Sequence, residues 1–211
     1  MRKNIIAARE QAEQFSESQL LNSTLALLFD LVIVLLYTTV FITVIVLFTG
    51  LWPPTTAVIS GSMEPGVETG DLIILYSPTH VLNADGAGPN ALVTKYESED
   101  SDNFGQPGEV VVFTPHGKVS EYDVIHRLMF YVEEGENWYE RGNPEYIDGT
   151  SCFEIRNCPA PNSGYITKGD ANERYDQVMG ISKPVPEENV RAVAKARLPG
   201  LGNLRMYIHL E

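Results

Sequence analysis

An uninterrupted apolar stretch at residues 31–51, LVIVLLYTTVFITVIVLFTGL, limits the possible folds more than any other part of the chain. As a helix it would be about 31 Å long at 1.5 Å per residue, which matches the hydrocarbon core of a bilayer. Helices in soluble cores are rarely this apolar on every face. We predict a transmembrane helix within residues 25–52, bounded by Asp30 and by Trp52, after which two prolines stop the helix.

Basic residues around this helix predict its orientation. Three of them precede the helix, whereas the first one after it is Lys95. The positive-inside rule therefore makes residues 1–24 a cytoplasmic segment and residues 53–211 an extracytoplasmic domain, in a cell membrane that the chain crosses once. The apolar run and the polar segment before it are both too long for a cleavable signal peptide.

Composition excludes one class of partner. The 211 residues include 28 acidic and 15 basic ones, for a net charge of −13. This field repels phosphates, so we expect no nucleic acid partner. There are six lysines against nine arginines. An acidic, lysine-poor surface is typical of a halophilic protein, for example from an archaeon, although an ordinary acidic protein is the alternative.

The sequence after residue 52 is typical of a β domain. Short β-branched runs alternate there with Gly, Pro, Asn and Asp, and no long segment has helical periodicity. Strands are predicted at residues 71–76, 109–114, 124–132 and 191–198, with weaker signals at 137–142 and 164–169. We predict a mainly β fold, a sandwich or a partly open barrel, with insertions near residues 77–108 and 144–163.

Two cysteines, Cys152 and Cys158, lie in the second insertion. They form no CxxC pair and no cluster with histidine, so we expect neither a metal site nor a cofactor. In an extracytoplasmic domain they could close a small loop as a disulfide, and two free thiols are the alternative.

A possible nucleophile is Ser62, in the sequence SGSMEP. A serine hydroxyl needs a base within hydrogen-bond reach and donors that stabilise the oxyanion. Gly61 permits close approach of a substrate, Ser60 could turn its hydroxyl toward the same point, and Met63 supplies an apolar wall. Most Gly-Ser turns carry no chemistry, so this motif alone is weak.

Among the four histidines, His126 is the best candidate for the base. It lies within a predicted strand, where alternation points it away from Ile125 and Arg127. A strand histidine satisfied by a backbone partner is the alternative. The other three are His80 in the first insertion, His116 in a predicted turn, TPHGK, and His209 near the C-terminus.

Two aspartates, Asp170 and Asp176, follow in YITKGDANERYDQVMG. A catalytic histidine needs its second nitrogen held, and a carboxylate does this while stabilising the imidazolium. Both aspartates could instead be turn formers, a reading that is stronger for Asp170, which follows Gly169.

Taken together, these motifs resemble one protein family. An N-terminal anchor is followed by SGSMEP, GDLIIL, VIHR, YITKGDAN with a later aspartate, and VRAVAKARLPGLG. This is the order found in type I signal peptidases of the archaeal and endoplasmic reticulum type. The resemblance spans roughly residues 25–202, and the insertions and the cysteine loop depart from the family's compact core.

The resemblance assigns roles to individual residues. Ser62 matches the family's nucleophile and His126 its base, where the bacterial branch uses a lysine. Asp176 matches the third catalytic residue, and Asp170 a supporting aspartate. Ser60 matches the hydroxyl that helps the Ser62 backbone N–H bind the oxyanion. The implied fold is the family's mainly β protease domain, anchored by one helix.

The implied function is removal of signal peptides from secretory preproteins after small residues, at the membrane, with the secretion translocon as an expected partner. Ser62 follows Leu51 by eleven residues, a tether of at most about 40 Å, so we expect the nucleophile near the membrane surface. A non-catalytic anchored binding module and a self-cleaving protease of the same fold are the alternatives.

Overall fold

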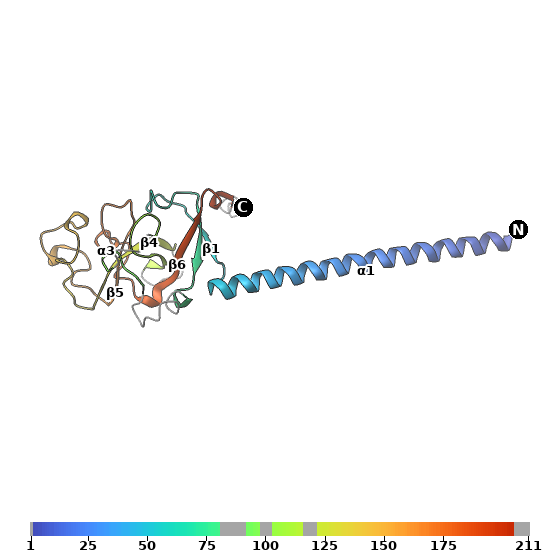
Figure 1. Ribbon diagram of the computed structural model, residues 1–211, viewed down its shortest axis with the longest axis horizontal. Helices are drawn as coiled ribbons and strands as arrows, with labels where there is room; N and C mark the ends of the chain where they lie inside the picture. The colour runs from blue at the N-terminus through green and yellow to red at the C-terminus, as the bar shows by residue number, and fades with distance from the viewer. Residues whose placement is uncertain (1, 81–91, 98–102, 116–121, 205–211) are drawn as a thin grey trace. The chain divides into compact units, whose positions relative to one another are not determined.

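The computed structural model describes residues 2–80, 92–97, 103–115 and 122–204 (Figure 1). The chain divides into two compact units, Met1–Leu47 and Phe48–Glu211, which we describe separately. The predictions for His116 and His209 lie outside the described residues.

The first unit is formed by the helix α1, Arg2–Thr49. The predicted helix is confirmed, although it starts well before residue 25 and ends at Thr49. Its segment Gln19–Thr49 is long and apolar enough to cross a membrane. Hydroxyls within this segment bond back to the preceding turn, as Thr38 does to the carbonyl of Val34 at 2.8 Å. Such bonds lower the cost of placing a threonine in hydrocarbon.

The second unit is built on a six-stranded antiparallel sheet within the described residues, with strand order β1-β2-β6-β3-β4-β5. Its strands are β1 (Thr55–Ala57), β2 (Leu72–Tyr76), β3 (Val110–Phe113), β4 (Val124–Val132), β5 (Gly164–Lys168) and β6 (Val190–Leu198). Short helical turns are η2 (Pro144–Tyr146), η3 (Cys152–Glu154), α3 (Asp176–Met179) and η4 (Glu187–Asn189). The prediction of a mainly β domain is therefore confirmed.

Five of the six predicted strands are present, and one is wrong. Residues 137–142 form a turn whose Trp138 is fully buried, so the aromatic run that suggested a strand serves the core instead. The three-residue strand β1 was not predicted, because it is too short for alternation to show. The four-residue helix α3, which packs against β5, is also too short to give a periodic signal.

Buried side chains form three apolar clusters around the sheet. One of them lies between β4 and the segment that links β4 to β5, where Phe130, Trp138 and Tyr175 pack edge to face or tilted, with ring centroids 5.8–6.2 Å apart. The indole of Trp138 donates to the carbonyl of Asn157 at 2.8 Å, so its polar group is satisfied. The insertion near residues 144–163 thus adds its own core to the domain.

A disulfide joins Cys152 to Cys158, with the two Cα atoms 5.1 Å apart. Both cysteines are buried, and Ile155 between them packs into the same cluster. The cross-link therefore holds the η3 turn against the domain. The chain-entropy argument gives about 2 kcal/mol for a loop of this size.

We expect alkylation of the denatured, unreduced protein to label no cysteine, and alkylation after reduction to label two. Replacing both cysteines by serine should lower the free energy of unfolding by about 2 kcal/mol, because the unfolded chain loses its constraint. Mass spectrometry and denaturant unfolding measure the two effects. Two labels without reductant would show that the disulfide is absent.

Candidate active site

The loop that carries Ser62 connects β1 to β2 and is fastened at its base. Val58 N–H donates to the carbonyl of Asp71, and Gly70 N–H donates to the carbonyl of Val58, both at 2.9 Å. Met63 is 1% exposed and packs into an apolar cluster with residues of β2, β3 and β6. Because Met63 points inward, its neighbour Ser62 is held at the surface of the domain, half-buried.

Ser60 lies beside Ser62, as the sequence suggested. The two hydroxyl oxygens are 3.4 Å apart, at the limit of a hydrogen bond. Ser60 is exposed, so its hydroxyl is free to turn toward a bound molecule.

A second segment supports the serine loop from behind. The backbone N–H of Ala171 donates to the carbonyl of Ser62 at 2.9 Å. A Cβ on Gly169 would lie 2.6 Å from the same carbonyl oxygen, so this position has no room for a side chain. The turn after β5 is therefore in direct contact with the serine loop.

His126 and Asp176 form a buried contact. The imidazole Nδ1 lies 2.7 Å from the carboxylate Oδ2, and the two side chains are 5% and 0% exposed. An ionised carboxylate only accepts hydrogen bonds, so Nδ1 carries the proton and Nε2 is left as the acceptor. His126 comes from β4, the strand next to the edge strand β5, and Asp176 from the first turn of α3.

A cleft of about 590 Å³ brings the serine loop and His126 together. Ser60, Ser62, His126 and Asn172 are polar residues of its lining, while Val58, Ile59, Met63, Val67, Val112, Val124, Ile125 and Ile181 contribute apolar walls. Within the described residues no hydrogen bond joins Ser62 to His126. Catalytic contacts of this kind often close only when substrate binds.

Asp170 is held by Arg127 and makes no hydrogen bond or ion pair with His126 in the described part of the chain. The guanidinium donates to both carboxylate oxygens, at 2.8 and 2.6 Å, and both side chains are nearly fully buried. Arg127 also donates to backbone carbonyls of Asn103, Gln106, Pro107 and Gly108. The pair thus ties the segment before β3 to the turn that supports Ser62.

The sequence did not predict the contacts of Lys168, which lies close to this pair. Lys168 is buried and donates to the carbonyl of Gly169 at 2.9 Å, with its ammonium 4.4 Å from the ring centroid of Tyr146. Burial lowers the pKa of Lys168, and the carboxylates of Asp170 and Asp176 partly oppose this. Only the motif TKGD pointed to this segment, and it gave no partner for the lysine.

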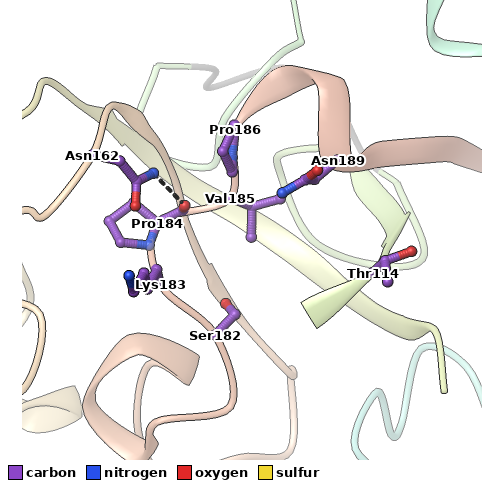
Figure 2. A pocket seen from close by; sticks show the side chains of 8 residues that line it. All are labelled: Thr114, Asn162, Ser182, Lys183, Pro184, Val185, Pro186 and Asn189. Atoms are coloured by element: carbon purple, nitrogen blue, oxygen red, sulfur yellow. Dashed lines mark hydrogen bonds between the residues drawn. The ribbon is translucent and has the colours of Figure 1, made fainter. Parts of the chain in front are cut away.

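The remaining candidates lie elsewhere. His80 does not line the cleft. A second cavity of about 200 Å³ is lined by Thr114, Asn162 and the segment around Pro184, where the Asn162 amide donates to the carbonyl of Pro184 at 2.8 Å (Figure 2). Its lining contains no carboxylate, histidine or cysteine. No group of three or more potential metal ligands occurs in the part of the chain that the structure describes.

The chain is similar in sequence to a known protein. The chain is 29% identical over 158 residues to the signal peptidase complex catalytic subunit sec11 of Aspergillus oryzae. The match covers 74% of this chain and spans 65% of the relative's own length. No family model matches the chain. The resemblance to signal peptidases of the endoplasmic reticulum type, indicated by the motifs, is confirmed by this similarity.

Removing one partner of the buried ion pair should destabilise the domain strongly. We expect Asp170→Asn to lower the free energy of unfolding by about 3–5 kcal/mol, because Arg127 keeps a buried charge without its counter-ion. The matched control is Asp148→Asn, which breaks the exposed pair with Arg174. That change should cost less than about 1 kcal/mol. Denaturant unfolding of the full chain in detergent compares the two, and equal losses would contradict this assignment.

Proposed function

We propose that this chain, which resembles signal peptidases of the endoplasmic reticulum type, is a membrane-anchored serine endopeptidase that removes signal peptides from secretory preproteins. The observation that carries the proposal is that Ser62 and His126 line the same cleft, with His126 held by a buried carboxylate. The similarity to a signal peptidase catalytic subunit supports the same reaction.

The proposed mechanism proceeds through an acyl-enzyme. Ser62 Oγ attacks the scissile carbonyl carbon while His126 Nε2 takes the hydroxyl proton. The imidazolium then passes this proton to the leaving amine, and Asp176 stabilises the ring while it is charged. The Ser62 N–H and the Ser60 hydroxyl donate to the oxyanion. A water, activated by His126 in the same way, hydrolyses the ester and regenerates the serine.

The shape of the cleft suits an extended peptide. On one side β1 is the edge strand of the described sheet, and the segment that follows it, Val58 to Ser60, lines the cleft. On the other side the pairing of β4 with β5 starts at Arg127, so Val124, Ile125 and His126 have no β5 partner in this register. Peptides bind such edges through backbone hydrogen bonds. The apolar lining fits the small residues that the resemblance implies at the −1 and −3 positions.

The apolar helix α1 supports anchoring in the membrane. We place the N-terminal segment in the cytoplasm and the catalytic domain outside it, as the basic residues before the helix predict. Signal peptides end near the outer surface with their apolar segment in the bilayer, so an anchored enzyme meets its substrate there. Association with the translocon, and with a complex such as the relative's name describes, belongs to the same proposal.

Because its composition is acidic and poor in lysine, we also propose that the protein works at high salt concentration. Salt dependence of preprotein cleavage tests this part independently of the active-site assignment.

Loss of either reacting group should abolish cleavage of a model preprotein. We expect Ser62→Ala and His126→Ala to lower kcat by about 10⁴-fold or more, because the nucleophile and its base act as a unit. Ser60→Ala should cost about 10²- to 10³-fold, the typical effect of one oxyanion donor. Single-turnover cleavage by the full chain in detergent measures these effects.

The control is Ser77→Ala, whose hydroxyl bonds to Thr79 outside the cleft and should not affect the rate. Undiminished cleavage by Ser62→Ala would contradict the assignment of Ser62 as the nucleophile. Absence of cleavage by the wild-type chain would favour a non-catalytic binding module. Shortening of the wild-type chain itself, absent from Ser62→Ala, would favour a self-cleaving protease.

Cleavage should also fall as the pH is lowered through the protonation of His126. Only the neutral imidazole accepts the proton of Ser62, so kcat/KM should drop about tenfold per pH unit on the acid side. The pH profile of preprotein cleavage measures this. A rate that stays constant down to pH 4 would exclude His126 as the base.

A further inference from the structure

We propose that Thr167, itself oriented by Gln177, is a positioning residue that acts on His126 through Asp176. This inference rests on the proposed function, because it assigns the support of the proposed base. Thr167, Gln177 and Asp176 are each 0% exposed, so their contacts are isolated from solvent.

Thr167 and His126 share one carboxylate oxygen. The Thr167 hydroxyl lies 2.6 Å from Asp176 Oδ2, and His126 Nδ1 lies 2.7 Å from the same atom. The second oxygen, Oδ1, is buried without a hydrogen-bond partner among the described residues. Thr167 is therefore one of two side chains among the described residues that hydrogen-bond to the Asp176 carboxylate.

Gln177 fixes the direction in which the Thr167 hydroxyl points. The backbone N–H of Thr167 donates to Gln177 Oε1 at 3.0 Å, which identifies the oxygen end of this amide. The other end, Nε2, then donates to the Thr167 hydroxyl oxygen at 3.3 Å. Since that oxygen accepts from the amide, its single proton is directed to Asp176.

Gln177 is itself held from the far side. Its Nε2 also lies 3.1 Å from the Ser182 hydroxyl and 3.2 Å from the carbonyl of Lys183. Both of these residues line the second cavity (Figure 2). A continuous chain of hydrogen bonds therefore runs from the wall of that cavity, through Gln177, Thr167 and Asp176, to His126.

This chain has a consequence for the charge on His126. Two donors divide the negative charge of one carboxylate, so removing the threonine hydroxyl leaves more of that charge to the imidazole. A nearby negative charge favours the protonated ring. Loss of the hydroxyl should thus raise the pH at which His126 protonates and leave the Asp176 carboxylate less well oriented.

Other charged groups nearby are already paired or lie outside this contact. Arg127, also on β4, is paired with Asp170, and Asp123 at the start of β4 is paired with Arg191. Lys168 on β5 donates to the carbonyls of Gly169 and Asp170, and Glu64 on the serine loop is exposed. Neither Thr167 nor Gln177 is charged, so replacing them leaves these groups unchanged.

The test replaces Thr167 by Val, which keeps the branched shape and removes the hydroxyl. We expect kcat for preprotein cleavage to fall about 10- to 100-fold with KM unchanged within about twofold, because a bond to a charged group is lost. The titration midpoint of the His126 imidazole, followed by NMR of the labelled full chain in detergent, should rise by about one pH unit. Thr167→Ser should restore both values.

The matched control is Thr94→Val. Thr94 is also fully buried and donates to a carboxylate, that of Glu97 at 2.8 Å, yet it does not line the cleft. It should leave kcat and the His126 midpoint unchanged. If Thr167→Val does not fold, Gln177→Met should give a smaller shift in the same direction, because the hydroxyl then loses its orientation.

Two outcomes would overturn the proposal: an unchanged His126 midpoint in a folded Thr167→Val protein, or failure of Thr167→Ser to restore it. The NMR measurement separates this proposal from the proposed function. A shifted midpoint in a protein that never cleaves preproteins would retain the hydrogen-bond chain and reject the protease. Cleavage of preproteins without any shift of the His126 midpoint would retain the protease and reject the role of Thr167.

Discussion

The buried contact between His126 and Asp176 is the interaction on which the rest of the candidate site depends. It joins β4, the strand next to one edge of the sheet, to a four-residue helix that has little stability of its own. Without this contact α3 would depend on its packing against β5 and on the hydrogen bonds that Thr167 and Gln177 make. The same contact also selects the tautomer of the neutral imidazole, because an ionised carboxylate accepts and never donates.

Around this contact, the domain uses buried polar groups as structural ties. Arg127 and Asp170 fasten the segment before β3 to the turn after β5, and the N–H of Ala171 in that turn reaches the carbonyl of Ser62. These three segments are thus held to one another by hydrogen bonds rather than by apolar packing alone. Such networks are costly when incomplete, and this makes them sensitive to single substitutions.

Much of this architecture could be predicted from the sequence because its signals are local. The apolar run at residues 31–51 is long and apolar enough to predict a spanning helix. The strand predicted at residues 124–132 matches β4 to the residue. The aromatic run at residues 137–142 gave a wrong strand, because buried aromatic residues in a turn produce the same pattern. The strand β1 was not predicted, because three residues are too few to show a periodic signal.

Partners within the site could not be predicted so well. The motif order suggested that Ser62, His126 and Asp176 belong together, but Thr167 and Gln177 bond to each other across a nine-residue turn with no sequence signature. Asp170 was predicted as a supporting residue, but its partner Arg127 was not predicted and drew attention only as the neighbour of His126. Pairing of polar groups depends on three-dimensional proximity, which residue spacing alone does not encode.

The disulfide between Cys152 and Cys158 has a consequence for how the protein matures. Disulfides persist in oxidising compartments and are rare where thiols are kept reduced. The cross-linked loop shares its apolar cluster with Tyr175, the residue immediately before Asp176. Completion of the domain is therefore coupled to arrival in an oxidising environment, and a chain retained in a reducing one would lack this constraint next to α3.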